Sequence, residues 1–168
     1  MTRPETVSLA YRSWVVMALA TCAGFVLLAV AAAVGPSPVA DLSDVRIPEG
    51  MDPGEFARVA RWMNVGFNAV FALLFGCLIL FFARSVYYRF AHPDRSRRTL
   101  WLLTVLVLYD ALLVSVSSAQ MEVDLWLMLA VGWVHICAAV AGVIALWFST
   151  RNDATAWVKG EKAHDPAH

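Results

Sequence analysis

The sequence predicts an all-α integral membrane protein, a bundle of four helices whose N-terminus and C-terminus both lie in the cytoplasm. Three observations support this prediction: the composition, four long apolar runs and the distribution of the basic residues. The 168 residues are 60% hydrophobic and 15% charged, whereas soluble domains have about 45–50% apolar and about 25% charged residues. The formal net charge is zero, so charge as a whole implies no strongly acidic or basic partner.

Four apolar runs are long enough to cross a bilayer. They cover residues 14–34, 62–83, 100–119 and 125–148. At a rise of about 1.5 Å per residue, a helix over each run covers a hydrocarbon core of about 30 Å. No run alternates as a barrel strand does, and a helix is the other way to pair every backbone polar group in lipid. The first run exceeds the 7–15 apolar residues or so of a signal peptide, so we expect it to be retained.

The basic residues fall unequally on the two sides of these runs. Ten of the 13 lysines and arginines lie before the first run, between the second and third, or after the fourth. Because cytoplasmic segments are enriched in Lys and Arg, the loop 84–99 and the tail 151–168 are predicted to be cytoplasmic, as are both termini. Tryptophans near the run ends are expected to anchor the spans at the membrane surfaces; they are Trp14, Trp62, Trp101, Trp126 and Trp147.

The loop 35–61 is the longest connection and lies outside in this arrangement. Near its end Asp52, Pro53 and Glu55 form the pattern of a helix start. The aspartate can cap the helix, the proline suits its first position, and the glutamate follows the cap by three residues. The second helix is therefore expected to begin here, before the membrane.

The third and fourth helices are expected to be antiparallel neighbours, because the loop between them is short. Asp94 or Ser96 is the candidate cap of the third helix, and Asp124 is the candidate cap of the fourth. Residues 1–150 are thus expected to form the bundle, and residues 151–168 a loose polar tail.

Four polar side chains lie inside the predicted spans, with Asp110 about mid-membrane and Asn68 at a similar depth. Asp110 and His135 are similarly distant from the outer face on neighbouring helices, and Asn64 and Asn68 lie one turn apart on the second helix. A carboxylate at a helix centre costs about 2.5–3.5 kcal/mol on insertion scales, so Asp110 is expected to have a partner. These four residues are predicted to form a buried polar cluster.

Two interpretations of this cluster stay open. A mid-membrane carboxylate beside a histidine is suited to proton transfer or to ligand binding. Alternatively, the cluster holds the bundle together through interhelical hydrogen bonds of about 0.6 kcal/mol each. Tyr109 and Ser115 are candidates for further members.

Small residues recur at a spacing of four in three of the runs. Such pairs let helix backbones approach closely in lipid, so some are expected at contacts between helices. The pairs are Ala20 with Gly24, Ala72 with Gly76, and Ala138 with Gly142.

The predicted cytoplasmic loop is basic and aromatic. Because the membrane holds both of its ends, we interpret its basic residues as contacts to anionic lipid, about 1 kcal/mol each, rather than to nucleic acid. These residues are Arg84, Arg89, Arg95, Arg97 and Arg98.

The sequence predicts no cofactor, metal site or catalytic residue. His135 is the one histidine inside a predicted span, so a single chain offers no second axial histidine for a haem. A haem shared with another subunit stays open. No pair of ligands has the spacing of a zinc site.

Two short segments resemble other proteins in layout. Residues 4–10 followed by Trp14, and residues 95–100 at the entry to the third run, look like those of small uncharacterised four-span membrane proteins of high-GC Gram-positive bacteria. The resemblance covers the arrangement of most of the chain. It implies a bacterial plasma-membrane protein and no particular activity.

The sequence therefore favours a non-enzymatic accessory or scaffold subunit of a larger membrane complex. Its expected partners are the bilayer and other membrane subunits or further copies of the chain, without nucleic acid. One alternative is a small proton-coupled transporter that uses Asp110 and His135. Another is a membrane anchor that shares a redox cofactor with a partner.

Overall fold

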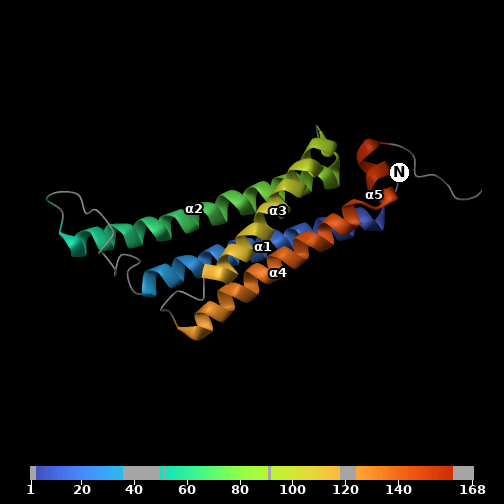
Figure 1. The fold of residues 1–168 in the computed structure, drawn as a ribbon. Helices are drawn as coiled ribbons and strands as arrows, with labels where there is room; N and C mark the ends of the chain where they lie inside the picture. The colour runs from blue at the N-terminus through green and yellow to red at the C-terminus, as the bar shows by residue number, and fades with distance from the viewer. Residues whose placement is uncertain (1–2, 36–49, 51, 91, 118–123, 161–168) are drawn as a thin grey trace, which may run out of the picture.

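The computed structural model describes residues 3–35, 50, 52–90, 92–117 and 124–160. All secondary structure in these ranges is helical (Figure 1), which confirms the all-α prediction for the described part of the chain. Four helices are long and apolar enough to cross a membrane, as predicted. The helices are α1 (Glu5–Val34), α2 (Pro53–Tyr88), α3 (Pro93–Ser117), α4 (Leu125–Ser149) and α5 (Asn152–Lys159).

Helix α1 makes the most extensive contacts, with α2 on one side and α4 on the other, and α3 packs against both α2 and α4. Figure 1 shows α3 and α4 running in opposite directions, as their short connection predicts. The buried core is built from small and medium apolar residues, with Met17, Ile79 and Leu100 fully enclosed. Alanines fill much of the remainder, so the helices lie close together.

Trp14 differs from its predicted role. The tryptophans at positions 62, 101, 126 and 147 are exposed, but Trp14 is only 1% exposed and belongs to the core. The reason is that α1 begins at Glu5, so Trp14 lies well inside the helix on the face that packs against its neighbours. An interfacial anchor would require a residue on the outward face.

Two of the predicted helix starts are confirmed. Asp52 accepts hydrogen bonds from the amides of Gly54 at 3.0 Å and Glu55 at 3.2 Å, and Pro53 is the first residue of α2. Asp124 accepts a hydrogen bond from the amide of Trp126 at 3.0 Å. Each cap satisfies amides that the first turn leaves without a helical partner.

The start of α3 differs from the prediction. The helix begins at Pro93, and the amide of Ser96 donates to the carbonyl of His92 at 3.1 Å. Asp94 therefore lies in the first turn, where it pairs with arginines, and Ser96 is already helical. A proline is preorganised for the first helical position, which moves the boundary before both candidate caps.

A fifth helix occupies part of the segment predicted to be a loose tail. Ala154 and Val158 lie four residues apart on one face of α5, and both are buried against the bundle. Arg97 of α3 donates to the Thr155 hydroxyl at 3.2 Å and to the carbonyl of Ser149 at 3.4 Å. The helix ends at Gly160, whose φ of 79° favours glycine.

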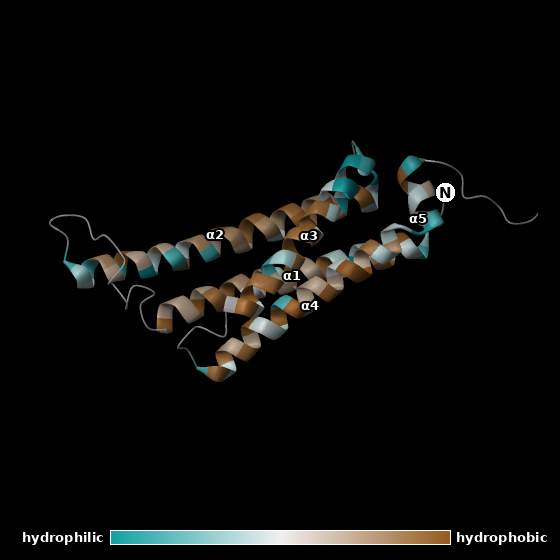
Figure 2. Cartoon of the chain, in the orientation of Figure 1, coloured by the Kyte–Doolittle hydropathy of each residue, from teal (hydrophilic) through white to brown (hydrophobic). Residues whose placement is uncertain are grey.

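The N-terminal half of α2 stands apart from the other helices. Its first buried residue is Ala72, and Figure 1 shows the preceding part of the helix diverging from α1. Figure 2 shows that this part is mostly apolar with polar interruptions. Among the described residues, no other helix covers α2 between the Asp52 cap and the beginning of the core.

Candidate functional site

The imidazole of His135 is the most deeply buried titratable group described. His135 lies on α4 and is 2% exposed. Its ring fills the space beside Gly24 of α1, where an added Cβ would lie 2.5 Å from Cε1. Nδ1 lies 2.8 Å from the carbonyl oxygen of Val131, and the ring of Phe25 meets the imidazole edge to face at 6.1 Å between centroids.

Asp110 of α3 faces the other nitrogen of this ring. Its Oδ2 lies 3.3 Å from His135 Nε2, within the distance of an ion pair, and its side chain is 30% exposed. At this separation Nε2 makes no hydrogen bond of good geometry within the described residues. The pair brings polar atoms of α3 and α4 face to face.

The Val131 contact identifies the nitrogen of His135 that donates. A carbonyl oxygen can only accept, so Nδ1 carries a proton and donates to Val131. Nε2 is the nitrogen that faces the Asp110 carboxyl group of α3, at 3.3 Å.

The asparagines form a separate pair on α2. Asn68 Nδ2 donates to Asn64 Oδ1 at 2.8 Å and to the Asn64 carbonyl at 2.9 Å. Asn64 is exposed and Asn68 is half-buried. Within the described residues, no hydrogen bond or ion pair joins them to Asp110 or His135. The structure thus arranges the four predicted residues as two pairs.

The two candidate further members lie outside these pairs. Tyr109 is 58% exposed. The hydroxyl of Ser115 donates to the carbonyl of Ala111 one turn earlier at 2.7 Å.

The three glycines of the small-residue pairs lie at contacts between helices, as predicted. A Cβ at Gly76 would collide with Cys22 Sγ of α1, and one at Gly142 would lie 2.7 Å from Met17 Sδ and from Thr104 Cγ2. Together with Gly24, these positions let each neighbouring helix approach to within side-chain contact. Thr104 was missed in the sequence, where the glycines were the available signal.

The five predicted lipid-contacting arginines differ in their partners. Arg97 and Arg98 pair with Asp94 at 3.5 and 3.0 Å. Arg89 lies over the Trp157 ring of α5 at 5.2 Å. Arg84 lies over the ring of its helical neighbour Tyr88 at 5.2 Å. Within the described residues, Arg84 and Arg95 have no carboxylate partner.

Comparison with known proteins gave no relative: no protein-family model matches the chain, and no curated protein or solved structure matches it. Support for a function therefore comes from the residues and their geometry.

Neither ring nitrogen of His135 faces open space. Nδ1 faces the Val131 carbonyl and Nε2 faces Asp110, so an axial bond to a haem iron would require one of these contacts to break. Across the described residues, no three His, Cys, Asp or Glu side chains are grouped as ligands for a metal ion. Of the polar residues predicted from the sequence, Asp110 and His135 are the two that meet between helices.

Proposed function

We propose that the chain is a multi-pass protein of a bacterial plasma membrane and acts as a non-enzymatic accessory or scaffold subunit of a larger membrane complex. Four apolar helices of sufficient length support the membrane location. The excess of Lys and Arg on one side supports cytoplasmic termini. The four long helices account for most of the described residues.

The exposed amide pair on α2 is the observation that carries this proposal. Within the described residues, Asn64 accepts from Asn68 but its own Nδ2 has no acceptor. Asn64 lies near the start of the apolar run 62–83 and Asn68 lies one turn further in, where lipid offers no hydrogen-bond partner to a polar side chain. A helix of another subunit can supply the acceptor, since amide side chains are common contacts between membrane helices.

The uncovered outer half of α2 gives such a helix a place to pack. Met63 and Phe67 flank the amides and are exposed, and Gly66 has open space around it. Packing of apolar side chains with a few hydrogen bonds is the usual basis of helix association in lipid. We therefore assign the partner contact to α2 between Asp52 and Ala72.

A photo-crosslinking experiment tests this assignment in the native membrane. A benzophenone amino acid replaces Phe67, and the matched control carries it at Leu102 of α3, which is also exposed. We expect position 67 to give a stoichiometric adduct with one other membrane protein, identified by mass spectrometry, and position 102 to give none. The adduct should be lost in Asn64→Leu/Asn68→Leu, because the polar contact is removed.

The proposal fails if position 67 reacts no more than position 102. It also fails if every adduct contains a second copy of the chain, since the protein would then be a homo-oligomer without a larger complex.

The Asp110–His135 pair favours a second candidate, a small proton-coupled transporter. A histidine and an aspartate that face each other at 3.3 Å between α3 and α4 are groups suited to proton transfer. A homo-oligomer would support this candidate. Its direct test is pH-dependent flux in liposomes that Asp110→Asn abolishes.

A shared redox cofactor has less support. A haem between subunits would need a histidine nitrogen from this chain, and both nitrogens of His135 already face protein acceptors. A visible absorption band in the purified native complex would bring this third candidate forward.

A further inference from the structure

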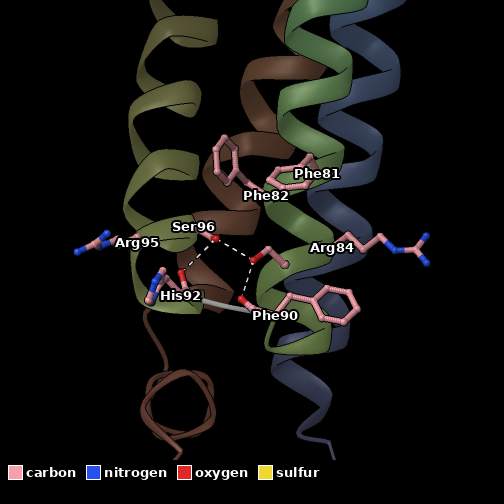
Figure 3. Close-up of a pocket in the computed structure, with 8 residues that line it drawn as sticks. Phe81, Phe82, Arg84, Phe90, His92, Arg95 and Ser96 are labelled. Atoms are coloured by element: carbon pink, nitrogen blue, oxygen red, sulfur yellow. Dashed lines mark hydrogen bonds between the residues drawn. The ribbon is translucent and has the colours of Figure 1, made fainter.

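Helices α2 and α3 are held together at the turn that joins them. Ser96 of α3 donates to the Ser85 hydroxyl of α2 at 2.9 Å, and Ser85 donates to the carbonyl of Phe90 at 3.1 Å. Figure 3 shows these bonds beside an apolar pocket of about 480 Å³ at this end of the two helices. Both serines are buried, so this end of the helix pair is closed.

Two rows of residues extend from the serine contact at a spacing of seven, which keeps each row on nearly one helix face. The rows face each other, because both begin at the bond between Ser85 and Ser96. Phe71 and Asp110 are equally far from these serines, about 21 Å along their helices. The row on α2 consists of Ser85, Leu78, Phe71 and Asn64, and the row on α3 consists of Ser96, Leu103 and Asp110.

The burial of the facing side chains decreases along these rows. Leu103, near the closed end, is 6% exposed. Further along, Phe71 is 42% exposed and the Asp110 side chain is 30% exposed, and Asn64 beyond them is exposed. Figure 1 shows α2 and α3 diverging in this direction. The described helices therefore leave the two rows partly uncovered at their open end.

Asp110 places a carboxyl group at this open end. In the proposed membrane arrangement it lies in the middle of the apolar run 100–119, where lipid offers no hydrogen-bond partner. Among the described residues, His135 is the group that faces this carboxyl group, and its Nε2 makes no hydrogen bond of good geometry. Charged side chains inside a membrane pair with one another, so a basic side chain would complete the site.

We propose that a transmembrane helix of the partner subunit packs between α2 and α3 and places a lysine or arginine against Asp110. The same helix supplies the acceptor for the Asn64 amide. A second copy of the chain cannot supply the basic residue from a span, because its four apolar runs contain no Lys or Arg. The inference rests on the proposed accessory function and specifies the chemistry of the partner.

Photo-crosslinking in the native membrane tests the contact with α3. A benzophenone amino acid replaces Val114, which lies one turn beyond Asp110 on the same face and is half-buried. The matched control carries it at Leu112, on the opposite face, which is 61% exposed. We expect position 114 to form an adduct with the same protein as position 67, through a helix that contains Lys or Arg, and position 112 to form none.

Variants of Asp110 test the charge pair. Asp110→Asn should lower the amount of partner recovered with the full chain by about tenfold or more, because the basic residue loses its counter-charge in lipid. Asp110→Glu keeps the charge and should retain the partner. The control Asp153→Asn removes the same charge from an exposed position on α5 and should leave the recovery unchanged.

An adduct at position 67 without the same protein at position 114 would overturn this inference and leave the accessory function standing. A crosslinked helix without Lys or Arg, or equal recovery with Asp110→Asn and Asp153→Asn, would also overturn it. Failure of both positions to capture another membrane protein would refute the accessory function itself. The crosslinks are made with Asp110 in place, so they decide the contact independently of whether Asp110→Asn folds.

Discussion

His135 occupies the space that a side chain at position 24 would need. The ring is 2% exposed and is bound to the Val131 carbonyl at 2.8 Å, so it cannot swing aside without losing that contact. A built Cβ at Gly24 would lie 2.5 Å from Cε1, 2.9 Å from Nε2 and 3.0 Å from Nδ1. A methyl group at position 24 would therefore force α1 and α4 to pack differently.

We predict that Gly24→Ala destabilises the bundle by about 1–3 kcal/mol, the usual cost of overpacking a core. The control is Gly66→Ala on α2, where nothing lies within 4 Å of the new methyl group and helix propensity favours alanine by up to about 1 kcal/mol. Unfolding of both variants by SDS, followed by circular dichroism, measures the difference. Equal stability of the two variants would contradict the packing described for His135.

Much of the polar site depends on rotations that no single helix reveals. Asp110 and His135 could be predicted to lie at one depth, because both are counted from the same short connection. The contact between His135 and Gly24 could not be predicted, because it depends on how α1 is rotated against α4. Asn64 and Asn68 share a helix face by their spacing, but only the divergence of α2 shows that this face is uncovered.

At the scale of the helices, the first residue of a helix is easier to predict from local sequence than the way in which the helix packs. Asp52 and Asp124 cap α2 and α4 as their sequence patterns indicate, since a cap needs only neighbouring residues. The predicted start of α3 was wrong by a few residues, because the helix begins at Pro93. Helix α5 was missed because its two buried residues are too few to reveal an apolar face.

We predict that Val158→Asp detaches α5, because the change would place an unpaired carboxylate in a buried contact. Hydrogen exchange of residues 152–159 should rise by about tenfold or more, which corresponds to about 1.4 kcal/mol. Asn152→Asp adds the same charge at an exposed position of the same helix and should leave the exchange unchanged. Similar exchange in both variants would show that Val158 does not hold the helix.

For the molecule as a whole, four apolar helices and an uneven distribution of basic residues predict which ends face the cytoplasm. The Lys159 end and the Arg58 end should lie on opposite sides of the membrane. This arrangement would also bring Arg84 and Arg95 to the cytoplasmic leaflet.

Cysteine labelling checks this topology. In intact spheroplasts, a membrane-impermeant maleimide should label Arg58→Cys but label Lys159→Cys only after lysis. The unmodified chain is the control, since its three cysteines lie within the long apolar helices. Labelling in the reverse order would show that the proposed orientation is inverted.

The length of α2 has a mechanical consequence. With 36 residues and a rise of about 1.5 Å each, the helix is about 54 Å long, whereas the hydrocarbon core is about 30 Å thick. In the proposed membrane arrangement, the ten residues or so before the apolar run would extend about 15 Å beyond the bilayer surface at the Asp52 end. A subunit bound to this part of α2 could tilt the helix. Because α2 is long, the tilt would also move the turn at its other end, where α2 meets α3.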